Sequence, residues 1–79
     1  MNVYPNPTEN TITMDFLVAT YLGGVVRIVG QNGIIIFEQQ IEDKGMHQLT
    51  FDMTSVSAGL YFVNYADALG VTVKHIVKR

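Results

Sequence analysis

The chain alternates apolar and polar residues along most of its length, and no segment shows the spacing of an amphipathic helix. Near the start, Ile12, Met14 and Phe16 share one face, and the residues between them are polar. A period of two is typical of a strand that buries one face and exposes the other. The alternation therefore predicts an all-β fold.

Seven short segments carry a strand pattern, and turn-forming residues separate them at intervals of about 8 to 12 residues. The segments are residues 2–4, 11–16, 25–29, 34–41, 47–52, 60–66 and 71–78. The strongest turn signal is Asn32-Gly33, because these residues accept the positive φ values of a tight hairpin. Gly70 suits a left-handed position in the last hairpin. This arrangement favours an immunoglobulin-like antiparallel β-sandwich of about seven short strands.

Strand phase also predicts which side chains fill the core. In the third segment, Val26 and Ile28 should point inward and Arg27 outward. The fourth segment has an inner phase that Gln39 interrupts, formed by Ile35, Phe37 and Ile41. The last segment alternates two sets, Val71, Val73, His75 and Val77 against Thr72, Lys74, Ile76 and Lys78.

Tyr61 stands at the start of a late strand, directly after the loop formers Ser57 and Gly59. In immunoglobulin-like sandwiches a Tyr in this position hydrogen-bonds the backbone of the preceding loop. We interpret Tyr61 as such a corner residue, and the alternative is a core aromatic whose hydroxyl lies in water. Most of the tyrosines fall in inward phases, so core packing is favoured over sugar stacking for the set Tyr4, Tyr21, Tyr61 and Tyr65.

The composition describes one small apolar domain that spans residues 1–79, with 48% hydrophobic and 15% charged residues. A net charge of -2 argues against nucleic acid as a partner, since phosphates require clustered Lys and Arg. The absence of Cys excludes disulfides and thiolate catalysis. No apolar run approaches the roughly 18 residues that span a bilayer, and the N-terminus lacks the pattern of an export signal.

The residues that could support catalysis or metal binding are few and scattered. Ser55 and Ser57 have no nucleophile-elbow spacing, and loop hydroxyls that satisfy backbone groups explain them better. His47 and His75 lie far apart without a Cys or a third His nearby, which disfavours zinc. We expect no enzyme activity, no cofactor and no metal. A calcium site assembled from separate loops stays open at this point, with candidates Asp43, Asp52 and Asp67.

Positive charge gathers at the end of the chain. Three of the five basic residues are Lys74, Lys78 and Arg79, on the expected last strand. One interpretation is protective, because Lys on an edge strand discourages edge-to-edge association. The other is a recognition tag, and charge alone does not choose between them.

Four motifs in order resemble a known family. They are Val3-Tyr4-Pro5-Asn6-Pro7, the turn that ends in Gly33, Gly59-Leu60-Tyr61 and the terminal motif Lys74-His75-Ile76-Val77-Lys78. The family is the type A C-terminal sorting domain of the type IX (Por) secretion system of Bacteroidetes. The resemblance covers essentially the whole chain, and the start, Val3-Tyr4-Pro5-Asn6-Pro7, is its most specific part. The residues that carry it, and that it marks as sorting-motif or partner-recognition positions, are Tyr4, Pro5, Asn6, Pro7, Gly33, Gly59, Tyr61, Lys74, His75, Ile76, Val77 and Lys78. One position departs from the pattern, since the family usually has Asp where this chain has Gly30.

The resemblance implies a non-enzymatic secretion signal excised from a larger exported protein. Similar domains direct an N-terminal cargo, already in the periplasm, across the outer membrane, and a sortase-like surface peptidase then removes them. The implied partners are the outer-membrane secretion machinery, that peptidase and the cargo in the same precursor. The competing hypotheses are an immunoglobulin-like adhesion or carbohydrate-binding module and a purely structural spacer.

Two further expectations concern the ends of the chain. Pro5 and Pro7 fix φ and favour extended neighbours, so the segment should leave the first strand as a stiff spacer without hydrogen bonds. Residues 71–78 should form an edge strand joined by a short turn. Because an edge offers unpaired backbone groups, we expect that this strand could exchange between two copies and give a dimer.

Overall fold

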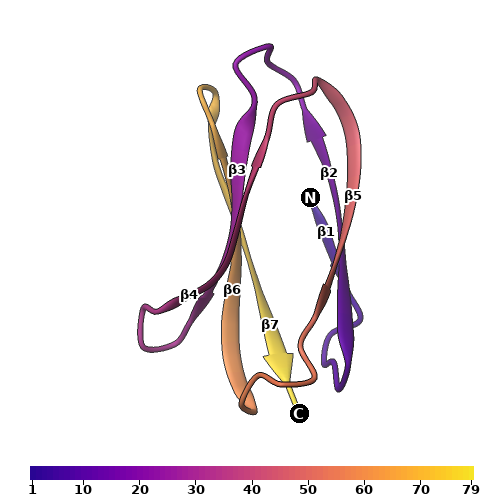
Figure 1. Ribbon diagram of the computed structural model, residues 1–79, viewed down its shortest axis with the longest axis vertical. Coiled ribbons are helices and arrows are strands. Elements are labelled where there is room, and N and C mark those ends of the chain that lie inside the picture. Colours follow the sequence, from indigo (N-terminus) through magenta and orange to yellow (C-terminus); the bar gives the residue numbers. More distant parts are fainter.

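The computed structural model describes all 79 residues and contains two antiparallel sheets and no helix (Figure 1). The strands are β1 (Asn2–Tyr4), β2 (Thr11–Val18), β3 (Gly24–Gly30), β4 (Ile35–Ile41), β5 (Gly45–Asp52), β6 (Gly59–Asp67) and β7 (Gly70–Lys78). The prediction of an immunoglobulin-like sandwich of seven short strands is confirmed. No helix that could cross a membrane is present.

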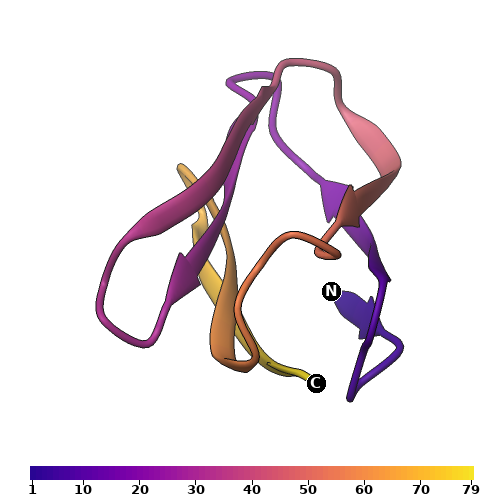
Figure 2. The same ribbon diagram turned by 60° about the horizontal axis from the view of Figure 1, so that its bottom comes forward.

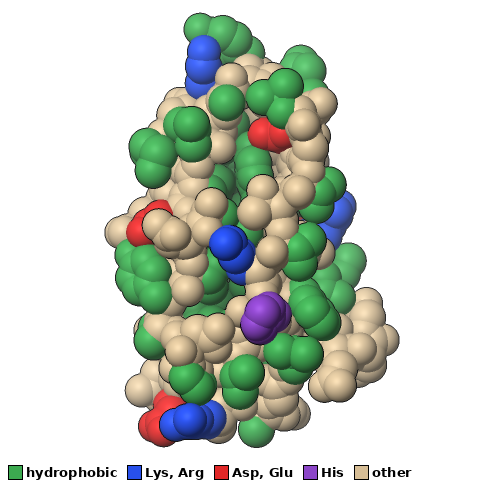
Figure 3. Space-filling model, turned by 180° about the vertical axis from the view of Figure 1, so that it is seen from behind, with side chains coloured by type: hydrophobic (Ala, Val, Ile, Leu, Met, Phe, Trp, Pro, Cys, Tyr) green, Lys and Arg blue, Asp and Glu red, His purple; other side chains and the backbone are tan.

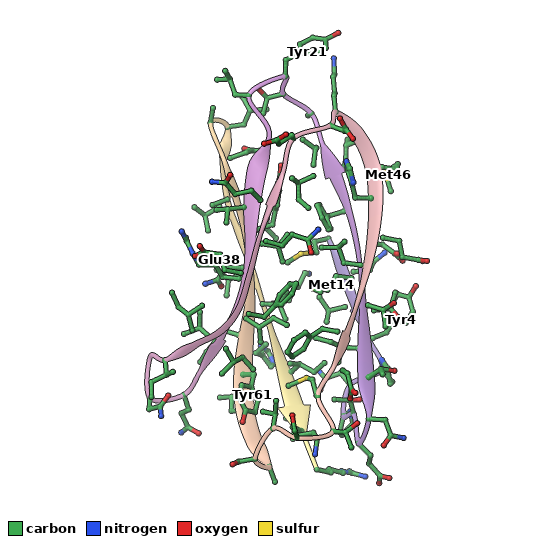
Figure 4. All side chains as sticks on the ribbon, in the orientation of Figure 1. Tyr4, Met14, Tyr21, Glu38, Met46 and Tyr61 are labelled. Carbon is green, nitrogen blue, oxygen red and sulfur yellow. The ribbon has the colours of Figure 1, made fainter.

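The smaller sheet has the order β1-β2-β5, and the larger has the order β4-β3-β6-β7. The two sheets face each other across the core, and Figure 4 shows Met14 between them. Glu38 and Met46 point away from the core on opposite sides in the same view. β7 forms one edge of the larger sheet, as the sequence predicted, and β4 forms the other.

Alternating side chains of three central strands supply most of the core. Ile12, Met14, Phe16 and Val18 come from β2, Val26 and Ile28 from β3, and Tyr61, Val63 and Tyr65 from β6, all of them buried. Ile76 of β7, Met53 and Ile41 complete the cluster. The inward phases predicted for β2 and β3 are therefore confirmed.

The prediction for β4 is wrong at Ile35, which is 50% exposed. A bulge shifts the register between β3 and β4, so that Ile28 lies opposite Phe37 while the next residue, Val29, lies opposite Ile35. The extra residue, Ile36, packs against the core together with Phe37. A bulge moves every side chain before it to the other face, and alternation alone does not reveal it.

The hairpin between β3 and β4 also differs from the prediction. Only Gly33 has a positive φ, of 85°, and no non-glycine residue has one, so Asn32 does not adopt the predicted conformation. The Gly30 amide donates to the Ile34 carbonyl at 2.8 Å, and the Gly33 amide donates to the Gly30 carbonyl at 2.9 Å. These bonds close a loop of three residues that ends in a glycine, a common alternative to the two-residue turn.

Two of the four tyrosines contradict the expectation that most would point inward. Tyr4 is 43% exposed and Tyr21 is 85% exposed, whereas Tyr61 and Tyr65 are buried. The ammonium of Lys44 lies 4.3 Å from the centre of the Tyr21 ring, a cation–π contact at the rim. A short β1 and an exposed connection between β2 and β3 place Tyr4 and Tyr21 outside the core.

Candidate functional site

Three of the four motifs meet at the end of the sandwich where β6 begins and β7 ends, which we call the lower end. Figure 2 brings this end forward and shows the loop after β1, the start of β6 and the chain terminus close together. The register places Gly59 opposite Lys78, Leu60 opposite Val77 and Tyr61 opposite Ile76. The third and fourth motifs, Gly59–Tyr61 and Lys74–Lys78, are therefore neighbouring stretches of one antiparallel pair.

Asn6 binds the outer edge of β7 with both atoms of its side-chain amide. Its Nδ2 donates to the His75 carbonyl at 3.2 Å, and its Oδ1 accepts from the Val77 amide at 3.0 Å. These are the two backbone groups that a neighbouring strand would pair. The amide of Asn6 thus takes the place of a strand residue at this edge.

Thr8 continues the contact two residues further along the chain. Its amide donates to the Val77 carbonyl at 2.9 Å, and its carbonyl accepts from the Arg79 amide at 2.9 Å, which forms a parallel bridge to β7. The Thr8 hydroxyl donates to the Thr11 carbonyl at 2.8 Å, and the residue is only 1% exposed. Thr8 fixes the end of β7 and the start of β2 together.

The expectation of a stiff spacer without hydrogen bonds is therefore wrong. The segment Pro5–Thr8 turns back from β1 toward β2, with cis peptide bonds before both Pro5 and Pro7. Its rigidity presents Asn6 and Thr8 to β7 and does not carry the chain away from the domain. The segment Pro5–Thr8 therefore fixes the terminal motif in place through hydrogen bonds.

Tyr61 is the predicted corner residue. Its hydroxyl donates to the Ser57 carbonyl at 2.6 Å, and the ring is 8% exposed. Gly59, just before it, has a φ of +151°, which a residue with a side chain rarely adopts. Together they fix the path by which the chain enters β6 opposite the end of β7.

The Gly33 hairpin reaches the same end of the molecule but makes no hydrogen bond to β7. With the loop before β6 it encloses an open hollow of about 700 Å³, lined by residues 30–32, 34, 36 and 55–61. Asn32 Oδ1 accepts from the Ile34 amide at 3.1 Å and lies 2.9 Å from the place of a Cβ on Gly30. A side chain at position 30 would therefore require the side chain of Asn32 to shift.

Tyr4 belongs to a different group of residues, on the outer face of the smaller sheet. Its hydroxyl donates to Asp15 Oδ2 at 2.9 Å, and Gln48 Nε2 donates to Asp15 Oδ1 at 2.9 Å. The hydrogen bond to Asp15 raises the pKa of Tyr4. Tyr4 therefore joins β1, β2 and β5 and does not contact the terminal motif through its hydroxyl.

The terminal motif is only partly accessible. Ile76 is fully buried and Lys78 is 8% exposed, whereas Val77 is 39% exposed. Lys74 and His75 are also exposed. The Lys78 ammonium donates to the Arg79 main-chain oxygen at 2.9 Å. Of the two phases left open by the sequence, the one with Ile76 and Lys78 faces inward at this end.

Two members of the site had no signal of their own in the sequence. Thr8 resembles any polar loop residue, and Asp15 occupies an ordinary outward position of β2. Their roles depend on partners far away in the chain. The arrangement as a whole holds strands and a terminus in place, because Asn6, Thr8 and Tyr61 form hydrogen bonds with backbone groups of other segments.

Comparison with known proteins identifies the class of domain. The family of the secretion system C-terminal sorting domain matches residues 2–79, and the chain belongs to that family. The resemblance found in the motifs is thereby confirmed. Membership implies a cargo that precedes the domain in one precursor, secretion machinery as partner, and export toward the cell surface. No curated protein and no solved structure gives a significant match.

Proposed function

We propose that this domain is a non-catalytic signal that takes an attached cargo from the periplasm across the outer membrane by type IX secretion. A sortase-like peptidase then cuts the domain from the cargo, which is anchored at the surface or released. In this proposal the outer-membrane machinery and the peptidase are the partners, and residues 1–79 act as one unit.

The observation that supports this function best is the convergence of the family's motifs on the terminal strand. Pro5–Thr8, Gly59–Tyr61 and His75–Arg79 are joined by hydrogen bonds within one end of the sandwich. The polar side chains of Asn6 and Tyr61 are paired with backbone groups of the domain itself, although Gly59 and Tyr61 also line the open hollow beside the Gly33 hairpin. Here they stabilise the shape of a strand, as a signal read by a protein partner requires.

The test is a fusion of residues 1–79 to a periplasmic reporter in the native bacterium. We expect the reporter at the cell surface or in the medium, and its mass should show that the 79 residues have been removed. The same fusion without residues 74–79 should stay in the periplasm. Retention of the intact fusion would contradict the sorting role, and surface delivery with the domain still attached would contradict only its removal.

Strand exchange is a further part of the proposal. β7 pairs with β6 of its own chain, and the turn that joins them contains only Ala68 and Leu69. Opening of that turn would let β7 pair with β6 of a second copy through the same register. Sedimentation over a concentration series measures this, and a monomer at every concentration would contradict it.

A further inference from the structure

The outer faces of the two sheets have opposite chemistry. On the smaller sheet, cross-strand partners are polar over most of the face, such as Thr11 with Asp52 and Asp15 with Gln48. On the larger sheet, Ile35, Val29 and Phe62 form an apolar row that ends at His75, and the next row is Glu38, Arg27, Asn64 and Val73. A polar outer face is expected where a sheet contacts water, whereas an exposed apolar face commonly marks an interaction site.

The apolar face extends over all four strands of the larger sheet and reaches the terminal motif. Val73 and Val77 of β7 are 54% and 39% exposed, and Ile35 of β4 is 50% exposed. Of the three accessible members of the terminal motif, His75 and Val77 lie on this face and Lys74 lies in the opposite phase. Figure 3 shows the sandwich from behind, with both sheets edge-on, and hydrophobic side chains are mixed there with polar and charged ones.

The face contains one ion pair, and both of its residues belong to the face. Arg27 and Glu38 lie opposite each other on β3 and β4 and form a salt bridge, so the two charges compensate. On this face β7 presents Val71, Val73, His75 and Val77, because Lys74 lies in the opposite phase, across from Val63. A complementary surface is therefore largely apolar, with a polar group where it meets His75.

The size of the face indicates a transient partner. Four strands spaced about 4.8 Å apart, over about six residues of 3.3 Å, cover roughly 400 Å² in projection. A patch of this size is within the range that marks functional surfaces on monomers. Two such faces packed together would bury roughly 800 Å², less than the about 1,200 Å² of a stable interface.

We infer that the outer face of β4-β3-β6-β7 is the surface by which the secretion machinery binds this domain. The inference rests on the proposed function, and it assigns different tasks to the motifs and to this face. The contacts of Asn6, Thr8 and Tyr61 hold β7 in place, and the partner binds the apolar face that β7 completes. A weak apolar interface suits a signal that must be bound and then released.

The experiment compares charged substitutions on the two outer faces in the full precursor, expressed in the native bacterium. The variants on the larger sheet are Ile35→Glu, Val73→Glu and their combination. The matched controls on the smaller sheet are Leu17→Glu and Met46→Glu, at positions 56% and 72% exposed. We expect surface delivery of cargo to fall roughly tenfold or more in the double variant, because each new charge would be buried unpaired at the interface. The controls should deliver normally.

Thermal unfolding of each variant separates binding from folding, and either single variant serves if the double one does not fold. Normal delivery by folded face variants, with failure on deletion of residues 74–79, would overturn this inference and leave the sorting role intact. Normal delivery after the deletion as well would overturn the sorting role. If the wild-type domain sediments as a dimer that the face variants dissolve, the occupant is a second copy and the inference is wrong.

Discussion

The two halves of β7 are held in different ways. From Gly70 to Lys74 the strand pairs only with β6, and Val71 is 67% exposed. From His75 to Lys78 it lies between β6 on one side and the Pro5–Thr8 segment on the other. Terminal strands ordinarily fray from their free end. Here the end is the best-fixed part, so opening should begin at the hairpin between β6 and β7.

The largest expected difference between the halves is in core packing. Ile76→Ala should lower the free energy of unfolding by about 2–5 kcal/mol, because Ile76 is fully buried and its loss leaves a cavity. Val71→Ala, in the exposed half, should change it by about 0.5 kcal/mol or less. Urea unfolding measures both. Equal losses in the two variants would remove the distinction between the halves.

A smaller loss of stability is expected when the side-chain amide of Asn6, which binds the His75–Lys78 half of β7, is removed. Asn6→Ala removes the hydrogen bonds to the His75 carbonyl and the Val77 amide, which together should contribute about 1–2 kcal/mol. The Val77 amide should then exchange its hydrogen faster, while amides of the Gly70–Lys74 half keep their rates. Asn2→Ala, at an exposed position of β1, is the matched control. Unchanged exchange at Val77 would mean that Thr8 alone fixes the strand.

The sequence predicted the strands and the corner tyrosine but not the contact between the two ends. Alternation locates β2, β3 and β6 because each buries one complete face, and Tyr61 follows from its place after a loop. Asn6 contacts residues 69 and 71 positions away, and a hydrogen bond at that distance leaves no periodic pattern. In β7 both phases contain apolar residues, and only the position of the opposite sheet decides that Ile76 is buried.

Each half of β7 also lies opposite a tyrosine of β6 whose hydroxyl is hydrogen-bonded. Tyr61, opposite Ile76, donates to a neutral carbonyl of Ser57, and Tyr61→Phe should cost about 1 kcal/mol. The exposed Tyr21 provides the control, since Tyr21→Phe should have no measurable effect. Thermal unfolding compares the two variants. A loss at Tyr21 that matches the loss at Tyr61 would show that the corner bond contributes nothing specific.

The second tyrosine is Tyr65, which lies opposite Thr72 in the Gly70–Lys74 half of β7. It makes this half of the strand sensitive to alkaline pH. Burial, followed by the hydrogen bond to Asp67, raises the pKa of Tyr65 from 10.0 to about 12. The folded state therefore holds this proton more tightly than the unfolded chain, and the resulting stabilisation is complete below pH 10 and lost between pH 10 and about 12. Denaturant unfolding across this interval should show the decline. The decline should be smaller in Tyr65→Phe, and an identical decline in that variant would assign it to other groups.

β7 is the last strand of the sandwich in chain order, and it covers the edge of β6 that no other strand pairs. A chain whose synthesis stops before Gly70 therefore has a bare β6 edge, and Asn6 and Thr8 have no strand to bind. The domain acquires its finished shape only after every residue upstream of β7 has been made. A product truncated before β7 therefore lacks the hydrogen bonds that fix the lower end of the sandwich.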